Sequence, residues 1–523
     1  CLSMCCLSCS FSCGCPEKGE GTDMIQQIIA NFSSLQVWLG LVVGVVGGMV
    51  VGAMPGLSGG MAIALLLPVT YSMEPVAALV MLMAIYTAAM TGGSISAILL
   101  HTPGTPANAA TAMEGYPLTK KGRGLEAIGM SMLSSGIGGF ASAIALLVIA
   151  PPLAKVSLMF SEPESFLISI FGLTVIGSLA GNSILKGLLM GAVGLFIATV
   201  GTDSVTGALR YTFGVDRLMS GIQMVPALIG LFTVAQVMSN CEDYQNANKS
   251  LLEQNSTELG KKMLPKLAEL PRYVWTWVVS SVIGIVVGIL PGAGGNIGSW
   301  IAYDQTKKHS KHPEEFGNGS LEGLAACESG NNAVTGGSMI PLMTLSIPGS
   351  PNAAIILGGL LIQGLVPGAR LFTTQAPTTY SILIGFALSN ILMVFVGLAI
   401  ARYVVNVTKI PNSILMPVVV SLALIGSYAI NASMFDVGVA IAFGFLGYLM
   451  NKFDLSAAAL ILGLILGGTA ESGLMLSLVM AKGDVLGYYF GRPICLVLMA
   501  LIVLSVAGPV LSHIRGKKGK AKG

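Results

Sequence analysis

The sequence predicts an all-α membrane protein that crosses the bilayer many times. Of its 523 residues, 54% are hydrophobic and only 10% are charged, whereas a soluble domain carries about 25% charged residues. Inside lipid, only helices and closed barrels satisfy their own backbone polar groups. The apolar stretches run to roughly 20 residues, which fits spanning helices and is too long for barrel strands.

About eleven apolar stretches are long enough for a full crossing of the bilayer. They lie at 76–100, 126–152, 163–181, 183–200, 219–238, 322–347, 376–401, 413–430, 434–450, 456–475 and 491–511. Two further segments, 37–70 and 275–303, are too short for two crossings and are broken in the middle by Pro-Gly. We expect both to be helical hairpins that enter and leave the membrane on the same side.

Basic loops indicate which face is cytoplasmic, because Lys and Arg are enriched there. Four clusters define this face. They are Lys120, Lys121 and Arg123; Lys261, Lys262, Lys266 and Arg272; Lys307, Lys308 and Lys311; and the C-terminal Arg515, Lys517, Lys518, Lys520 and Lys522. The predicted organisation is a first membrane half at 24–238, a polar cytoplasmic linker at 239–272, a second half at 273–512 and a basic tail at 513–523.

The first 23 residues hold six of the nine cysteines, and a methionine, Met24, follows them. We interpret residues 1–23 as translated upstream sequence that is foreign to the natural protein. A genuine metal-binding or disulfide-bonded tail is the alternative, and its connectivity cannot be derived from spacing.

An internal repeat relates the two halves. Gly48-x3-Gly52-x2-Pro55-Gly56 recurs as Gly284-x3-Gly288-x2-Pro291-Gly292. Further along, Thr91-Gly-Gly-Ser94 recurs as Thr335-Gly-Gly-Ser338, and the Pro103-Gly104 turn recurs as Pro348-Gly349. Glu114-Gly115 then corresponds to Gln363-Gly364. Several motifs in the same order at nearly constant offset indicate a duplicated unit.

Charge placement predicts that the two repeats are inverted. The loop Tyr71 to Pro75, after the first hairpin, has no Lys or Arg, whereas the corresponding loop after the second hairpin is rich in lysine. Corresponding loops therefore lie on opposite faces. Inverted repeats with interrupted helices are typical of secondary transporters, whose site lies between the repeats near the bilayer midplane.

The two Pro-Gly breaks are the first candidate binding elements. Proline removes a backbone donor and glycine permits unusual dihedral angles, so each helix should stop inside the membrane. The next half-helix then presents free N–H groups and a positive dipole end, which suit a carboxylate. A kinked packing contact without ligand is the alternative. The candidate residues are Pro55, Gly56, Ser58 and Gly59 in the first break, and Pro291, Gly292, Gly294, Gly295 and Asn296 in the second.

The Thr-Gly-Gly-Ser and Pro-Gly elements supply further candidates, because they offer hydroxyls and accessible backbone within the membrane. Helix packing by small residues is the alternative explanation. These candidates are Thr91, Gly92, Gly93, Ser94, Thr102, Pro103, Gly104, Thr335, Gly336, Ser338, Pro348 and Gly349.

Glu328, Asn331 and Asn332 are the candidate ion-coupling residues. An ionisable side chain within a span is costly and usually functional, and amide oxygens suit a sodium ion. The alternative is that Glu328 lies near the cytoplasmic end and merely extends to water. Glu471 is a weaker candidate. No Walker-type loop or catalytic signature is present, so we expect neither an ATP-driven pump nor an enzyme, and no metal or other cofactor.

These motifs resemble the large permease subunit of the tripartite tricarboxylate transporters over about residues 36–480. The motifs that carry the resemblance are Gly52-Ala-Met-Pro55-Gly56, the run from Thr91 to Gly104, Met113-Glu-Gly-Tyr-Pro117, Pro291-Gly-Ala-Gly-Gly295 and Glu328-x-x-Asn331-Asn332. The sequence departs from the family pattern at His101, where Asn is common, and at Thr105, where an acidic residue is common.

The resemblance implies a multi-pass protein of the bacterial inner membrane that takes up tricarboxylates or related small carboxylates by symport with protons or sodium ions. It also implies two partners, a small membrane subunit and a periplasmic solute-binding protein. A stand-alone cation-coupled organic-anion carrier is the alternative within transport. A channel and a membrane-embedded enzyme are the alternatives from other classes.

Overall fold

The protein is helical almost throughout. The computed structural model describes residues 20–54, 57–179, 184–203, 206–242, 262–292, 294–407 and 412–505. Within these ranges, nine helices are long and apolar enough to cross a membrane, and shorter apolar helices accompany them. The predicted all-α polytopic class is confirmed.

The described residues of the first half form ten α-helices, one short hairpin and a few turns. The helices are α1 (Glu20–Ser33), α2 (Leu35–Ala53), α3 (Gly59–Leu66), α4 (Pro75–Leu100), α5 (Ala109–Lys120), α6 (Gly124–Ser157), α7 (Glu162–Leu179), α8 (Ile184–Ala198), α9 (Met224–Ile229) and α10 (Ala235–Glu242). Strands β1 (Gly201–Thr202) and β2 (Leu209–Arg210) pair antiparallel. A π-helical turn, Gly230–Val234, joins α9 to α10. Short 3-10 turns lie at Pro68–Ser72, Pro106–Asn108 and Asp216–Ser220.

The second half is likewise helical. Its helices are α12 (Val274–Ile289), α13 (Gly294–His309), α14 (Leu321–Leu345), α15 (Pro351–Ile362), α16 (Ala369–Phe372), α17 (Ala376–Val407), α18 (Asn412–Asn431), α19 (Met434–Lys452), α20 (Ala457–Met480) and α21 (Val485–Phe490). A further apolar helix covers Pro493–Ser505. The 3-10 turns Leu267–Tyr273 and Pro313–Glu315 precede α12 and α14.

Helices α4 and α14 form the centre of the molecule. Every residue of α4 from Val76 to Leu99 is buried, and so is α14 from Leu321 to Thr344 apart from Glu322. Helix α2 packs on α4, and α12 packs on α14. Glycines make this close approach possible, because a Cβ at Gly52 would lie 2.3 Å from the carbonyl oxygen of Ala89. Gly48, Gly284 and Gly288 lie against backbone atoms in the same way, so these glycines have a packing role.

The central helices end in the same way. Helix α4 ends at His101, with φ 54°, and α14 ends at Ser346, with φ 61°. A non-glycine residue in this left-handed region is uncommon. Each is followed by a Pro-Gly turn and a helix of 12 residues, α5 or α15. Gly104 N donates to Gly93 O at 3.3 Å, and Gly349 N donates to Ser338 O at 3.2 Å. The sequence repeat is therefore matched by a repeated structural unit.

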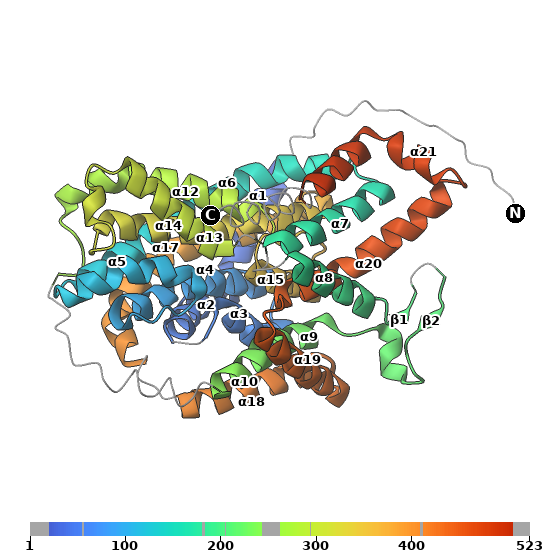
Figure 1. Cartoon of the computed structure of the whole chain (residues 1–523), viewed down its shortest axis with the longest axis horizontal. Helices are drawn as coiled ribbons and strands as arrows, with labels where there is room; N and C mark the ends of the chain where they lie inside the picture. Colours follow the sequence, from blue (N-terminus) through green and yellow to red (C-terminus); the bar gives the residue numbers. More distant parts are fainter. Residues whose placement is uncertain are drawn as a thin grey trace, which may run out of the picture.

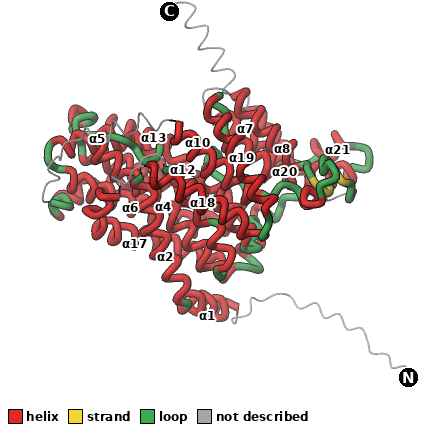
Figure 2. Tube along the Cα trace, turned by 90° about the horizontal axis from the view of Figure 1, so that it is seen from below, coloured by secondary structure: helices red, strands yellow, loops and turns green. Residues whose placement is uncertain are grey.

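The two halves are interleaved. Helix α6 of the first half packs along α14, and α17 of the second half packs along α4. Figure 1 shows α4, α6, α12, α14 and α17 gathered in one part of the molecule, with α5 at one end and the β1–β2 hairpin at the other. Figure 2 shows the same separation of α5 from the strands and α21. Each central helix is thus enclosed by elements of both halves.

The two interrupted segments differ in length. Helices α12 and α13 have 16 residues each, and the 3-10 turn before α12 extends it to a span-length helix, Ala268–Ile289. Helix α2 has 19 residues, about 28 Å at 1.5 Å per residue, whereas α3 has only 8. The first segment is therefore a spanning-length helix followed by a shorter one, Gly59–Ser72, whose last five residues, Pro68–Ser72, are 3-10 helical.

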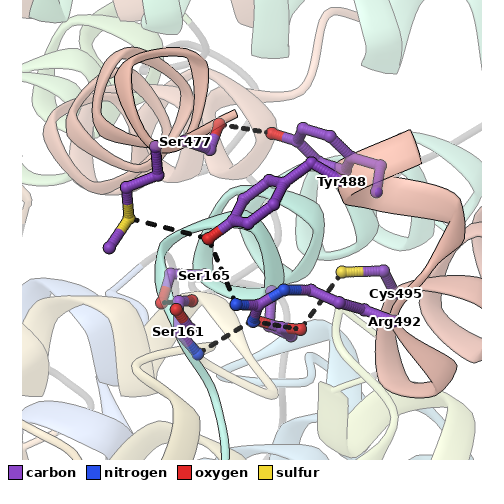
Figure 3. Close-up of polar contacts among 9 residues, drawn as sticks. Ser161, Ser165, Ser477, Tyr488, Arg492 and Cys495 are labelled. Carbon is purple, nitrogen blue, oxygen red and sulfur yellow. Dashed lines mark hydrogen bonds and ion pairs between the residues drawn. The ribbon is translucent and has the colours of Figure 1, made fainter. Parts of the chain in front are cut away.

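An ion pair attaches the C-terminal helix to α7. Arg492 donates to both carboxylate oxygens of the buried Glu164, at 3.1 and 3.0 Å. Cys495 Sγ lies 3.2 Å from the same carboxylate, and Tyr488 accepts a bond from Arg492 at 3.1 Å. Figure 3 shows Arg492 and Cys495 side by side facing this contact. The cluster has a full set of partners, so we assign it a structural role.

Candidate functional site

The carboxylate of Glu328 lies at the centre of a ring of hydroxyls. Its side chain is fully buried on α14. Ser94 donates to Oε1 at 2.6 Å, Thr111 donates to the same oxygen at 2.5 Å, and Ser135 donates to Oε2 at 2.8 Å. These three donors come from α4, α5 and α6. Glu328 therefore does not extend to water, and the repeat-1 helices converge on this one carboxylate of repeat 2.

A second row of contacts fixes the hydroxyl of Ser94. Asn108 donates to Ser94 Oγ at 2.8 Å and to the carbonyl of Met90 at 2.9 Å. Thr105 in turn donates to Asn108 Oδ1 at 2.5 Å. A Cβ at Gly93 would lie 2.2 Å from that amide oxygen, so glycine is required there. The turn after α4 thus supports the geometry around Glu328.

The charge of Glu328 has no protein counterion. Among the residues that the structure describes, no Lys, Arg or His forms an ion pair with it. A buried carboxylate without a counterion is costly, and a proton or a bound cation would neutralise it. A carboxylate surrounded by hydroxyl oxygens is a donor set that suits either. The site is therefore chemically equipped to exchange a proton or a small hard cation.

Asn331, one helical turn further along α14, is buried with neither amide atom hydrogen-bonded. A Cβ at Gly295 would lie 2.3 Å from Asn331 Oδ1, so the amide lies directly against the beginning of α13. The first N–H groups of a helix have no partner within that helix, and they attract anions. An unpaired amide and a helix N-terminus therefore meet at one place.

The corresponding place in the first repeat is the start of α3. Ser58 caps this helix by accepting a hydrogen bond from Met61 N at 3.2 Å. Built Cβ atoms at Gly59 and Gly60 would lie 3.2 and 3.0 Å from the side-chain amide of Asn352, at the start of α15. Met90 lies between the two places, because its sulfur is 3.7 Å from Asn352 Nδ2 and its methyl would be 2.6 Å from a Cβ at Gly295.

A polar crossing point joins α4, α14 and α17. Thr87 Oγ1 lies 3.1 Å from Asn332 Oδ1 and 2.7 Å from Asn390 Oδ1. Asn332 donates to Thr91 Oγ1 at 3.1 Å. All four side chains are fully buried. Asn332 is thus committed to protein partners, unlike its neighbour Asn331.

Tyr86 makes the contact that corresponds to that of Glu328. Its hydroxyl lies 3.2 Å from Ser338 Oγ and 2.8 Å from Ser350 Oγ. Ser338 occupies the position in repeat 2 that Ser94 occupies in repeat 1. One side chain of each central helix therefore contacts the Thr-Gly-Gly-Ser element of the other. This side chain is a carboxylate on α14 and a phenol on α4.

The remaining predicted site residues differ in their exposure and in their contacts. Asn296 and Pro103 are exposed, whereas Glu328 and its donors are buried. Gly92 packs against Met49, and Gly336 packs against Ser142. Thr335 bonds its own helix at Asn332 O, 2.6 Å away. Pro55 and Gly56 lie outside the described residues. The other candidates lie in the turns after α4, α12 and α14 or at the start of α13: Thr102, Gly104, Pro291, Gly292, Gly294, Pro348 and Gly349.

Several residues of the centre were not predicted from the sequence. Tyr86, Thr87, Thr111, Ser135, Asn352 and Asn390 are such residues. Single hydroxyls and amides in apolar helices carry no distinctive spacing. Their one available signal was position: Thr111 lies three residues before Glu114, and Asn352 follows the Pro-Gly turn.

The weaker candidate, Glu471, falls outside the centre. Glu471 forms an ion pair with Arg210, which holds the β1–β2 hairpin to α20. His312 lies 3.4 Å from Glu314 in an exposed loop. In the part of the chain that the structure describes, no group of three or more His, Cys, Asp or Glu side chains is placed to hold a metal ion.

The fold and its centre define a polytopic helical membrane protein with a polar, glycine-lined interior between two repeated units. The profile of the tripartite tricarboxylate transporter TctA family matches residues 39–462. The chain belongs to this family, which is a family of transporters, and the resemblance stated from the motifs is confirmed.

Two curated proteins of Agrobacterium vitis are similar to the chain. An uncharacterised 52.8 kDa protein in the TAR-I ttuC' 3' region is 37% identical over 505 residues, covering 95% of this chain and 98% of that protein. An uncharacterised protein in the TAR-II ttuC' 3' region is 37% identical over 235 residues, covering 45% of this chain and 97% of that protein. No solved structure matches.

Proposed function

We propose that this chain is the permease subunit of a cation-coupled uptake system for tricarboxylates or related small carboxylates. It works in the bacterial inner membrane with a small membrane subunit and a periplasmic solute-binding protein. Family membership supports the transport of a tricarboxylate and the existence of partner subunits. The coupling ion is H⁺ or Na⁺.

One observation carries the proposal for the site. Glu328 and Asn331 lie one turn apart on α14, the first a buried carboxylate without a counterion and the second a buried amide without a partner. We assign the cation or proton to Glu328 and its hydroxyls. We assign one carboxylate of the substrate to Asn331 and the N-terminus of α13. Met90 separates this subsite from the start of α3, where Asn352 lies.

Coupling is needed on physical grounds. A charge that moves against a membrane potential costs about 2.3 kcal/mol per 100 mV. A multivalent anion entering a negative cell therefore requires cations that carry at least as much charge inward. The interleaving of the two repeats and the unequal number of basic residues in their corresponding loops support an inverted arrangement. Inverted repeats permit access to alternate between the two faces.

The test is uptake of radiolabelled citrate by inside-negative vesicles that contain this chain, the small subunit and the receptor. A proton or a sodium gradient is imposed, and one protein is omitted at a time. The proposal predicts uptake that needs all three proteins and one of the two gradients. Uptake that persists without the receptor would instead identify a stand-alone carrier, and gradient-independent uptake would contradict cation coupling.

A further inference from the structure

Glu114 of α5 accepts four hydrogen bonds, all from residues of repeat 2. It is fully buried. Oε1 accepts from Tyr303 Oη at 2.7 Å and from Gly317 N at 2.6 Å. Oε2 accepts from Gly319 N at 2.9 Å and from Ser320 N at 2.7 Å. One side chain of repeat 1 thus holds α13 and the loop before α14, both of repeat 2.

The loop is shaped to bind this carboxylate. Gly317 and Gly319 have φ values of 90° and 96°, which side chains other than glycine rarely adopt. This backbone turns successive N–H groups toward one point and forms an anion-binding concavity. Ser320 is also the N-cap of α14 and accepts from Gly323 N at 3.2 Å. The negative charge of Glu114 therefore lies at the positive end of α14.

Gln363 of repeat 2 makes a much weaker contact on the corresponding loop of repeat 1, from the end of α15, whereas Glu114 lies within α5. Gln363 donates a single hydrogen bond, 2.6 Å long, to the carbonyl of Thr70 in the turn after α3. Each repeat therefore reaches the loop that follows the interrupted helices of the other. Four hydrogen bonds hold the carboxylate of Glu114 at one end of the molecule, whereas a single hydrogen bond holds the amide of Gln363 at the other.

The Glu114 contact is also connected to the proposed ion site. Thr111 lies one turn earlier on the same helix, and its hydroxyl donates to Glu328. Between the two lies a small cluster in which Ala110 of α5 contacts Tyr303, Phe316 and Cys327. A displacement of α5 would break both contacts at once and would uncover Cys327, which is fully buried.

We propose that Glu114 and its four donors form a latch that closes the cytoplasmic end of the substrate path in this conformation. The latch opens when α13 and the loop 316–320 move away from α5. The inference rests on the proposed transport function, whereas its test measures only the accessibility of a thiol. The lysines of the loops near positions 120 and 308 assign this end to the cytoplasm.

Cys327 is a native reporter of the latch. The test uses a variant in which every other cysteine is replaced by alanine, with and without Glu114→Ala, labelled by a membrane-impermeant maleimide in inside-out and right-side-out vesicles. We expect Glu114→Ala to speed the labelling of Cys327 by at least about tenfold in inside-out vesicles only, because each hydrogen bond to a charged acceptor contributes a several-fold change in an opening equilibrium.

Two controls separate a latch from general loss of structure. Gln363→Ala, at the opposite end, should leave the labelling of Cys327 unchanged. In a second background that retains only Cys495, buried beside Glu164, Glu114→Ala should leave that thiol protected. Unchanged labelling of Cys327 in Glu114→Ala, or faster labelling of both thiols, would overturn the proposal. Neither result depends on whether citrate is transported.

Discussion

Asn331 and Asn332 are adjacent and equally buried, yet their amides are in opposite situations. Asn332 bonds Thr87 and Thr91, whereas both amide atoms of Asn331 lack a partner. A buried polar group without a partner costs about 1–3 kcal/mol relative to a bonded one. Such a cost is retained at a position where the group serves a ligand rather than the fold.

We therefore predict that Asn331→Leu abolishes citrate uptake while the unfolding midpoint in detergent stays the same or rises. The leucine removes an unsatisfied amide of similar size, so stability has no reason to fall. The matched control is Asn332→Leu, which breaks two bonds and should lower the midpoint. A marked loss of stability in Asn331→Leu, or uptake at the wild-type rate, would show that Asn331 is not a ligand.

Among single residues, the sequence identified a carboxylate that is rare within a membrane span, but it did not identify the hydroxyls that surround it. Glu328 was identifiable because a carboxylate within a span is rare. Thr111 and Ser135 were not, because a hydroxyl in an apolar helix commonly bonds its own backbone. Asn296 was predicted as a ligand from its place after the break; its side chain is exposed on α13 whereas Gly295 is buried, and its role stays a prediction.

Glycine spacing determines how closely α2 and α4 approach. A Cβ at Gly52 would lie 2.3 Å from the oxygen of Ala89 and 2.8 Å from its Cα, both backbone atoms that cannot rotate away. Gly47, on the same helix, has only a leucine methyl at 3.9 Å. Both positions are glycines on the same helix, and they differ only in how closely neighbouring atoms approach them.

Gly52→Ala should consequently lower the stability of the protein in detergent by about 1–3 kcal/mol, the usual cost of forcing extra volume into a packed contact. Gly47→Ala should have no such effect, because alanine also favours the helix over glycine. Thermal unfolding followed by circular dichroism measures both. Equal midpoints for the two variants would contradict close packing of α2 on α4.

The long helices were predictable and the short ones were not. Stretches of about 20 apolar residues identify spans directly. Helices α5 and α15 have 12 residues each, which is too short to register as a crossing, and their role depends on the turns before them. The Pro-Gly turns were identified from sequence, but the left-handed residues His101 and Ser346 that end α4 and α14 were not.

The arrangement of the whole chain follows from the repeat. Helices α4 and α14 are each covered by a long helix of the other half, and Tyr86 and Glu328 make corresponding contacts across the centre. The repeat is visible in the sequence because glycine and proline have few substitutes at turns and close contacts. The swapped packing is not visible there, because it depends on contacts between helices far apart in the chain.

The two repeats differ at their corresponding central contacts. Ser94 contacts the carboxylate of Glu328, whereas the corresponding Ser338 contacts the phenol of Tyr86. Only the carboxylate can carry a charge that a proton or cation compensates at neutral pH. Our central claim is that this single difference links substrate movement to an ion gradient.

The most direct test of this claim is gradient-driven citrate uptake by Glu328→Gln in the complete three-protein vesicle system. The matched control is Glu471→Gln, which removes a membrane carboxylate that already has a basic partner in Arg210. We predict that Glu328→Gln loses the dependence of uptake on the ion gradient at wild-type membrane abundance, whereas Glu471→Gln keeps it. Gradient dependence that survives in Glu328→Gln would contradict the account and make Glu328 a structural residue.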